Sequence, residues 1–301
     1  MSHCFMLALV FLSDSCVYEI DRVEAVVMKH RYVDLNSDVG EHSERESDAR
    51  LMSSISSANI ACGYHGGDSF SMRETVRHAI DNGVAIGAHP GFADPEGFGR
   101  RSIDVSPVEV EVLVLDQIKK LAEIAIIEGG QLDHVKPHGA LYHMASERRE
   151  IADAVVRAVM VVDDKLVLFG MSGSSLLAAG QAAGLNIASE VFADRQYRSP
   201  AALVPRESPD ALVIDARQVV DRAVKMVLTG TVSCVDGVLA KVQADTICVH
   251  GDTPGAVELA SSVKVGLEAH GIVVAAPAHE PSPPVETPDR PSYRDSTDKG
   301  G

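Results

Sequence analysis

Residues 106–139 read SPVEVEVLVLDQIKKLAEIAIIEGGQLDHVKPHG, and this stretch decides the fold class. Ser106, followed by Pro107 and Glu109, is typical of a helix start with a capping box, and the later Gly-Gly pair predicts where the helix ends. A short apolar run then stops at a cluster of ionisable residues. The pattern predicts a helix leading into a buried strand that carries reactive groups at its end.

The same unit recurs along the chain. Because every crossover between parallel strands needs its own helix, seven such units indicate a parallel β/α barrel or an open parallel sheet, and we favour the barrel. Residues 231–243 fit a small hairpin or an insertion. The strand-like runs are 32–38, 56–65, 84–91, 133–139, 165–173, 186–195 and 246–252, and the helical patterns are 71–83, 106–130, 146–160, 174–184, 216–230 and 253–271.

Composition excludes several classes of partner. The chain of 301 residues has a formal net charge of -16, which repels nucleic acid and anionic membrane surfaces. The apolar run Phe5–Leu12 is too short to span a bilayer. Five cysteines without a C-x-x-C pair indicate neither a disulfide framework nor a zinc knuckle, so we expect a cytoplasmic protein.

The two ends of the chain differ from its centre. Residues 1–27 show no sustained period and are predicted to be a non-native or disordered extension, with Met28 as the natural start. Residues 276–301 are rich in proline and poor in apolar residues, so we expect a disordered tail. A single catalytic barrel domain is predicted over residues 28–275.

Polar residues lie where the apolar runs stop, and the carboxyl ends of parallel strands form the ligand site in such folds. In the first run Asp34, Asn36 and Asp38 alternate, so all three should face the barrel interior. A loop of Asp and Asn that only caps and turns is the alternative. Otherwise these carboxylates act as a base, bind a metal or orient a histidine.

Four histidines end later runs and should meet at one mouth, namely His65, His89, His138 and His250. Histidine suits acid-base or metal chemistry, although a histidine in a turn is the plainer interpretation. Asp68 precedes a helix and can simply cap it.

Cationic residues accompany these histidines. Lys136 shares its face with His138, and Arg100 and Arg195 lie in loops that would overhang the mouth, so an anionic small substrate is indicated. For each cation the alternative is an ordinary surface charge. Asp252 precedes a helix start that can accept an anion. The sequence has no G-x-x-x-x-G-K-[ST] and no G-x-S-x-G motif.

Eight motifs in order resemble the LamB/YcsF family over about residues 33–272: DLNSDVGE, SSANIACGYHGGD, VAIGAHPGF, GFGRR, HVKPHGALY, EVFADRQY, LVPR and ADTICVHGD. The resemblance implies a seven-stranded β/α barrel of the glycoside hydrolase/deacetylase type. It also implies cleavage of 5-oxo-L-proline to L-glutamate with ATP as co-substrate, together with partner subunits B and C. Self-association into a homo-oligomer stays open. Ser37 stands where the family usually has cysteine, which argues against a thiol nucleophile there.

That reaction needs a base for water, a proton for the leaving nitrogen and cations for oxygen charge. We therefore predict two groups of residues: catalytic, Asp34, Asp38, His89, Lys136 and His138; substrate-binding, Asn36, His65, Arg100, Arg195, His250 and Asp252.

Two alternatives stay open. One is a metal-dependent deacetylase or amidohydrolase that acts on another small substrate and binds a divalent ion through His65, His89 and Asp38. The other is a non-catalytic protein that binds substrate while its partners perform the chemistry. A metal requirement is not fixed by the sequence.

Overall fold

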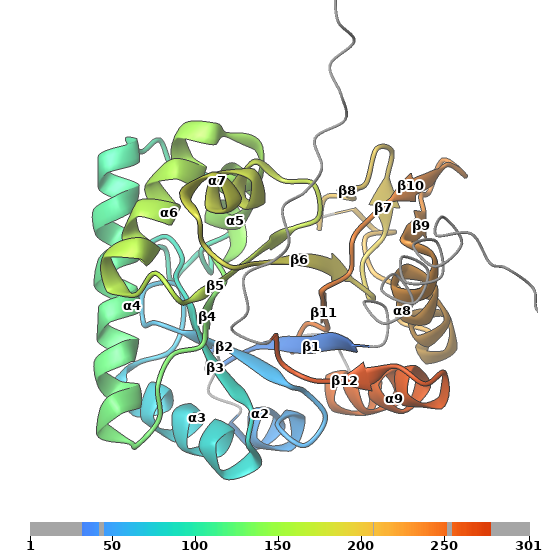
Figure 1. Ribbon diagram of the computed structural model, residues 1–301, viewed down its shortest axis with the longest axis horizontal. Coiled ribbons are helices and arrows are strands. Elements are labelled where there is room, and N and C mark those ends of the chain that lie inside the picture. Colours follow the sequence, from blue (N-terminus) through green and yellow to red (C-terminus); the bar gives the residue numbers. More distant parts are fainter. Residues whose placement is uncertain (1–31, 42–44, 207, 252–254, 278–301) are drawn as a thin grey trace, which may run out of the picture.

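The computed structural model describes residues 32–41, 45–206, 208–251 and 255–277, and its centre is a barrel of parallel strands (Figure 1). The barrel order is β1-β2-β3-β4-β5-β6-β11, and β11 pairs back onto β1. This closure excludes the open sheet and confirms the predicted seven-stranded barrel. The strands are β1 Tyr32–Val39, β2 Ser57–Ala61, β3 Ala85–His89, β4 His134–Val135, β5 Val167–Met171, β6 Ile187–Phe192 and β11 Thr246–Cys248.

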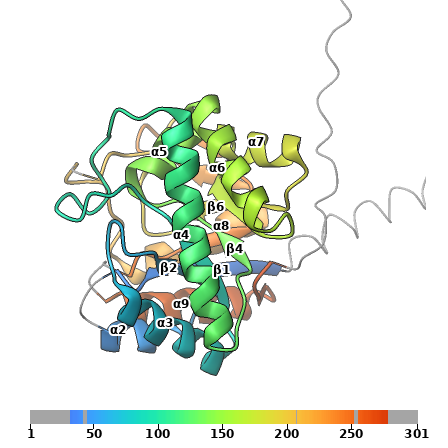
Figure 2. The ribbon, with the colours of Figure 1, turned by 90° about the vertical axis from the view of Figure 1, so that its left-hand side faces the viewer.

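Helices surround the barrel, and α4 runs along one side of it next to α6 (Figure 2). The predicted start of α4 is confirmed, because Ser106 caps it and Glu109 closes the capping box. Asp68 likewise caps α3. The helices are α2 Arg45–Leu51, α3 Ser69–Asn82, α4 Pro107–Ile127, α5 Gly139–Glu147, α6 Arg149–Val162, α7 Ser175–Ala183, α8 Ala216–Thr229 and α9 Ala256–Ala269.

Several elements differ from the expectation. The helix expected over 146–160 is α6, which begins at Arg149. It is preceded by α5, a helix that the sequence did not indicate, which begins at Gly139 without a side-chain cap. The hairpin expected over 231–243 is confirmed as β9 (Thr231–Ser233) and β10 (Leu239–Lys241). The sequence did not indicate α2 or the short strands β7 (Tyr197–Arg198), β8 (Ala202–Leu203) and β12 (Val273–Val274), of which β12 pairs with the start of β1.

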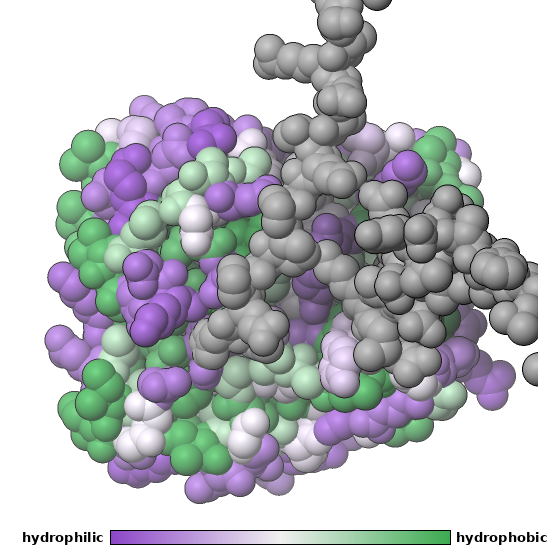
Figure 3. Space-filling view, viewed as in Figure 1, coloured by the Kyte–Doolittle hydropathy of each residue, from purple (hydrophilic) through white to green (hydrophobic). Residues whose placement is uncertain are grey.

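The apolar core lies mainly between the barrel and its helices, while the barrel interior holds many polar side chains. Within the described residues no helix is long and apolar enough to cross a membrane. The surface in Figure 3 mixes hydrophilic and apolar residues over its visible part. The predicted extension 1–27 and nearly all of the predicted tail 276–301 lie outside the described residues.

Candidate active site

Three polar side chains of β1, Asp34, Asn36 and Asp38, point into the barrel and form its first group of site residues. Asp34 accepts hydrogen bonds from Ser56, Ser57 and Thr246 at 2.6, 2.7 and 2.5 Å. Burial raises the pKa of Asp34 to about 6, although those hydrogen bonds act to lower it. Asp34 does not line the cavity described below. It therefore lies beneath the other residues that were predicted to be catalytic.

The next two of these side chains, Asn36 and Asp38, lie further along β1 in the barrel interior. Asn36 donates to Glu190 and Thr246 and accepts from Asn59, which also donates to Asp38. The alternation predicted for β1 therefore brings its polar side chains to one interior face, and the loop interpretation fails because these residues belong to a strand.

Lys136 is buried, which overturns the surface-charge alternative for this residue. Its ammonium group lies 2.9 Å from Asp38 Oδ1, 2.8 Å from Glu190 Oε1 and 3.2 Å from Asn36 Oδ1. Burial alone would lower the pKa of Lys136, but the Asp38 and Glu190 carboxylates raise it well above the usual value. Lys136 is therefore a fixed cation at the base of the site.

Three histidines lie together beside this lysine. His138 Nδ1 is 2.9 Å from His89 Nε2, and the rings of His65 and His138 stack with centroids 3.8 Å apart. Burial lowers the pKa of His65 to about 4. Burial would also lower the pKa of His89, but the Asp38 carboxylate outweighs it, and the pKa of this ring is raised.

Backbone geometry holds these rings in place. Phe98 has a φ of 54°, a conformation that costs energy outside glycine, and its carbonyl oxygen lies 2.9 Å from His138 Nε2. A Cβ on Gly91 would come within 2.6 Å of His65 Nδ1, so glycine is needed for the close approach. The GAHPG and GFG segments thus support the histidines directly.

The opposite wall carries His250 and two arginines. His250 Nδ1 lies 3.0 Å from Asp194 Oδ2, and the His250 ring stacks on Phe192. Arg195 is buried and donates to the Val204 carbonyl. Its pKa is lowered by burial and by the nearby charge of Arg206. Both arginines, Arg195 and Arg206, line the cavity described below.

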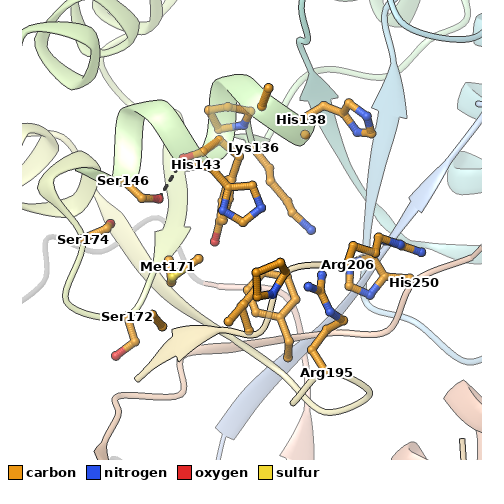
Figure 4. Close-up of a pocket in the computed structure, with 18 of the residues that line it drawn as sticks. Lys136, His138, His143, Ser146, Met171, Ser172, Ser174, Arg195, Arg206 and His250 are labelled. Atoms are coloured by element: carbon orange, nitrogen blue, oxygen red, sulfur yellow. Dashed lines mark hydrogen bonds between the residues drawn. The ribbon is translucent and has the colours of Figure 1, made fainter. Parts of the chain in front are cut away.

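A cavity of about 550 Å³ separates the two walls. Lys136 extends into the space between His138 and His250, while Arg195 and Arg206 lie on the far side (Figure 4). Arg100 also lines the cavity and lies over the Phe98 ring. Asp38, His89, Lys136, His138, Arg100, Arg195 and His250 therefore share one mouth, whereas Asn36 and His65 lie behind its lining and Asp252 lies outside the described residues.

Sequence reasoning missed three buried carboxylates: Glu41, Glu190 and Asp194. Each stands inside a quoted motif, and for Glu41 and Asp194 a position just after a strand end was the available signal, whereas Glu190 lies within β6. Burial would raise the pKa of Glu41, but the neighbouring His138 and His65 rings hold it well below the usual range. Burial also opposes ionisation of Asp38, yet His89 and Lys136 keep the pKa of this carboxyl well below its usual value.

Two groups of these side chains have the donor atoms for a metal ion. One consists of Glu41, His65, His89 and His138, and the other of Asp38, Cys248 and His250. The predicted set of His65, His89 and Asp38 is divided between them. Cys62 and Cys248 are buried free thiols, and burial raises the pKa of Cys62 to about 12.

A closed β/α barrel with paired acids, histidines and a buried lysine at the carboxyl ends of its strands defines a class of small-molecule acid-base enzyme. The chain belongs to the LamB/YcsF family, whose model matches residues 33–282.

Named relatives agree with this assignment. A Shouchella clausii protein, named as the A subunit of 5-oxoprolinase, is 50% identical over 81% of this chain and 98% of its own length. A Geobacillus kaustophilus protein of the same name is 47% identical over 83% of this chain and 98% of its own length. The crystal structure of a lactam utilization protein from Thermus thermophilus is 42% identical, with a TM-score of 0.76 over 81% of this chain and 99% of that one.

Proposed function

We propose that this chain is the A subunit of an ATP-dependent 5-oxoprolinase, which cleaves 5-oxo-L-proline to L-glutamate while ATP is hydrolysed to ADP and phosphate. The observation that carries the proposal is the buried Lys136, held by Asp38 and Glu190 at the base of a cavity whose far wall is arginine-rich. The names of the relatives at 45–50% identity supply the substrate.

The charges of the cavity suit a small anionic lactam. We assign Arg195 and Arg206, which line the cavity, to the substrate carboxylate, because guanidinium groups bind carboxylates in a planar, bidentate manner. Lys136 keeps Asp38 and Glu190 ionised at the base of the cavity, because its ammonium group contacts both carboxylates. We assign Arg100, which lines the cavity, to contact with a phosphoryl group.

Asp38 and His89 are the proposed acid-base pair. Both line the cavity, Asp38 Oδ2 lies 3.4 Å from His89 Nε2, and the ionised carboxylate raises the pKa of the ring. The pair takes a proton from the attacking water and returns it to the ring nitrogen of the substrate as the C–N bond breaks, while His138 orients the water. Phosphorylation of the lactam oxygen by ATP would convert a stable amide into a better electrophile.

Partner subunits complete the proposal. The relatives' name designates one lettered component of 5-oxoprolinase and so implies others, and we assign ATP use to the complex that this chain forms with subunits B and C. Free buried cysteines among the described residues suit a reducing cytoplasm.

Glutamate release from 5-oxoproline with ATP tests the proposal. The chain is assayed alone and with subunits B and C, and the Lys136→Met variant, verified as folded by circular dichroism and as associated, is assayed with the same partners. Activity in the complete mixture that the variant abolishes is the expected result. No glutamate from the complete mixture, with all three proteins folded and associated, would refute it.

A further inference from the structure

Three hydrogen-bond acceptors face one another at the closed end of the cavity. His89 Nδ1 lies 2.7 Å from the Lys136 carbonyl oxygen, and His138 Nε2 lies 2.9 Å from that of Phe98. A carbonyl oxygen can only accept, so each of these outer nitrogens carries its ring's N–H. When both rings are neutral, the inner nitrogens, His89 Nε2 and His138 Nδ1, present lone pairs to each other at 2.9 Å.

Glu41 adds a third acceptor to this pair. Its Oε1 lies 3.1 Å from His138 Nδ1 and 3.7 Å from His89 Nε2, and it has no hydrogen-bond partner among the described residues. A single proton on His89 Nε2 gives one N–H, which can point well at only one acceptor among His138 Nδ1, Glu41 Oε1 and Asp38 Oδ2, the last at 3.4 Å. Whenever that N–H points at His138 or Asp38, Glu41 Oε1 has no donor. Two protons would place N–H groups against each other. A cation at the centre satisfies all three atoms at once.

We propose that Glu41, His89 and His138 bind a divalent first-row metal ion, Zn²⁺ by preference. Two histidines and one glutamate form a ligand set of catalytic zinc sites, in which bonds of about 2.0–2.1 Å place tetrahedral ligands about 3.3 Å apart. The measured separations of 2.9, 3.1 and 3.7 Å lie around that value. The two backbone carbonyls hold the outer N–H groups as supporting contacts do in metal sites.

The fourth position of such a site is open to the cavity, because Glu41, His89 and His138 all line it. His65 has a different part. Its ring is parallel to that of His138, at 2°, so the two ring planes cannot converge on one ion. His65 packs against His138 and fixes its orientation. This inference concerns binding alone and does not depend on the reaction proposed above.

Metal retention by the untagged chain tests the inference without substrate, ATP or partners. Protein stripped with EDTA is titrated with Co²⁺, followed by visible absorption, and with Zn²⁺, followed by metal content after gel filtration. We expect about one ion per chain and imidazole-type Co²⁺ bands. Glu41→Gln, which keeps shape and volume, should raise Kd at least about tenfold, since even the loss of a supporting contact costs 10–100-fold.

Two controls locate the ion. His143→Asn removes an exposed histidine of the same cavity, and His250→Asn removes a member of the second donor group; both should keep one ion. Circular dichroism verifies that each variant is folded, and Zn²⁺ should raise the Tm of the parent but not of Glu41→Gln. No retained ion in the parent, or equal retention by Glu41→Gln, would overturn the inference in favour of a shared proton. Loss of binding only in His250→Asn would overturn it in favour of the other group.

Discussion

Lys136 and Glu190 form an ion pair across the barrel interior, with Nζ and Oε1 2.8 Å apart and side chains 3% and 0% exposed. Lys136 follows β4, Glu190 lies on β6, and β5 separates those strands. The pair therefore spans one intervening strand, whereas the contact of the same ammonium group with Asp38 reaches β1 on the other side of the barrel interior. Asp38 contacts the same ammonium group, so one cation compensates two carboxylates.

Lys136→Met should destabilise the fold by about 3–5 kcal/mol, because it leaves two buried carboxylates without a cation. Glu190→Gln should lower the free energy of unfolding by less, because Lys136 keeps its ion pair with Asp38. Urea unfolding of each variant measures the difference. Lys241→Met, at an exposed position of the cavity rim, is the matched control and should stay within about 0.5 kcal/mol. Equal costs for the two interior variants would contradict the shared-cation picture.

His138→Ala should reduce turnover about a hundredfold or more, because the ring lines the reactive end of the cavity. Steady-state glutamate release with subunits B and C measures it. His143→Ala removes an exposed histidine five residues away and should leave kcat within a few-fold. Near-normal turnover by His138→Ala would remove this residue from the chemistry.

Asp34→Asn should change how stability depends on pH. The folded pKa of Asp34 is about 6, above its ordinary value of 3.8, so the folded protein binds the extra proton between those limits. Stability due to this group is therefore lost as pH rises from about 4 to about 6, and it does not return above pH 6. The free energy of unfolding of both proteins is measured from pH 4 to 7. The stability of the variant relative to the parent should increase as pH rises from about 4 to about 6. A constant difference would contradict the raised pKa.

Cys248→Ala should retain turnover within a few-fold, although its sulfur lies 3.2 Å from Lys136 Nζ. Burial raises the pKa of this thiol well above its usual value despite that lysine, so it is not a thiolate nucleophile. Glutamate release and slow alkylation of the folded protein provide the readouts. A loss as large as that expected for His138→Ala would show that the sulfur takes part.

The sequence by itself determined the repeated strand and helix units, the α4 capping box and the face shared by Asp34, Asn36 and Asp38. These follow from local chemistry, because caps and strand alternation depend on residues a few positions apart. It also placed most polar groups at one mouth, since parallel strands end at the same edge.

Only the tertiary structure decided which groups meet and how deeply they are buried. Alternation gives a direction but no depth, so Asp34 and Asp38 looked equivalent although one lies beneath the cavity lining and the other on it. Glu41 and Glu190 became part of the site through contacts with histidine and lysine side chains distant in sequence. Closing seven strands into a barrel brings such residues within hydrogen-bonding distance, and no local pattern encodes that distance.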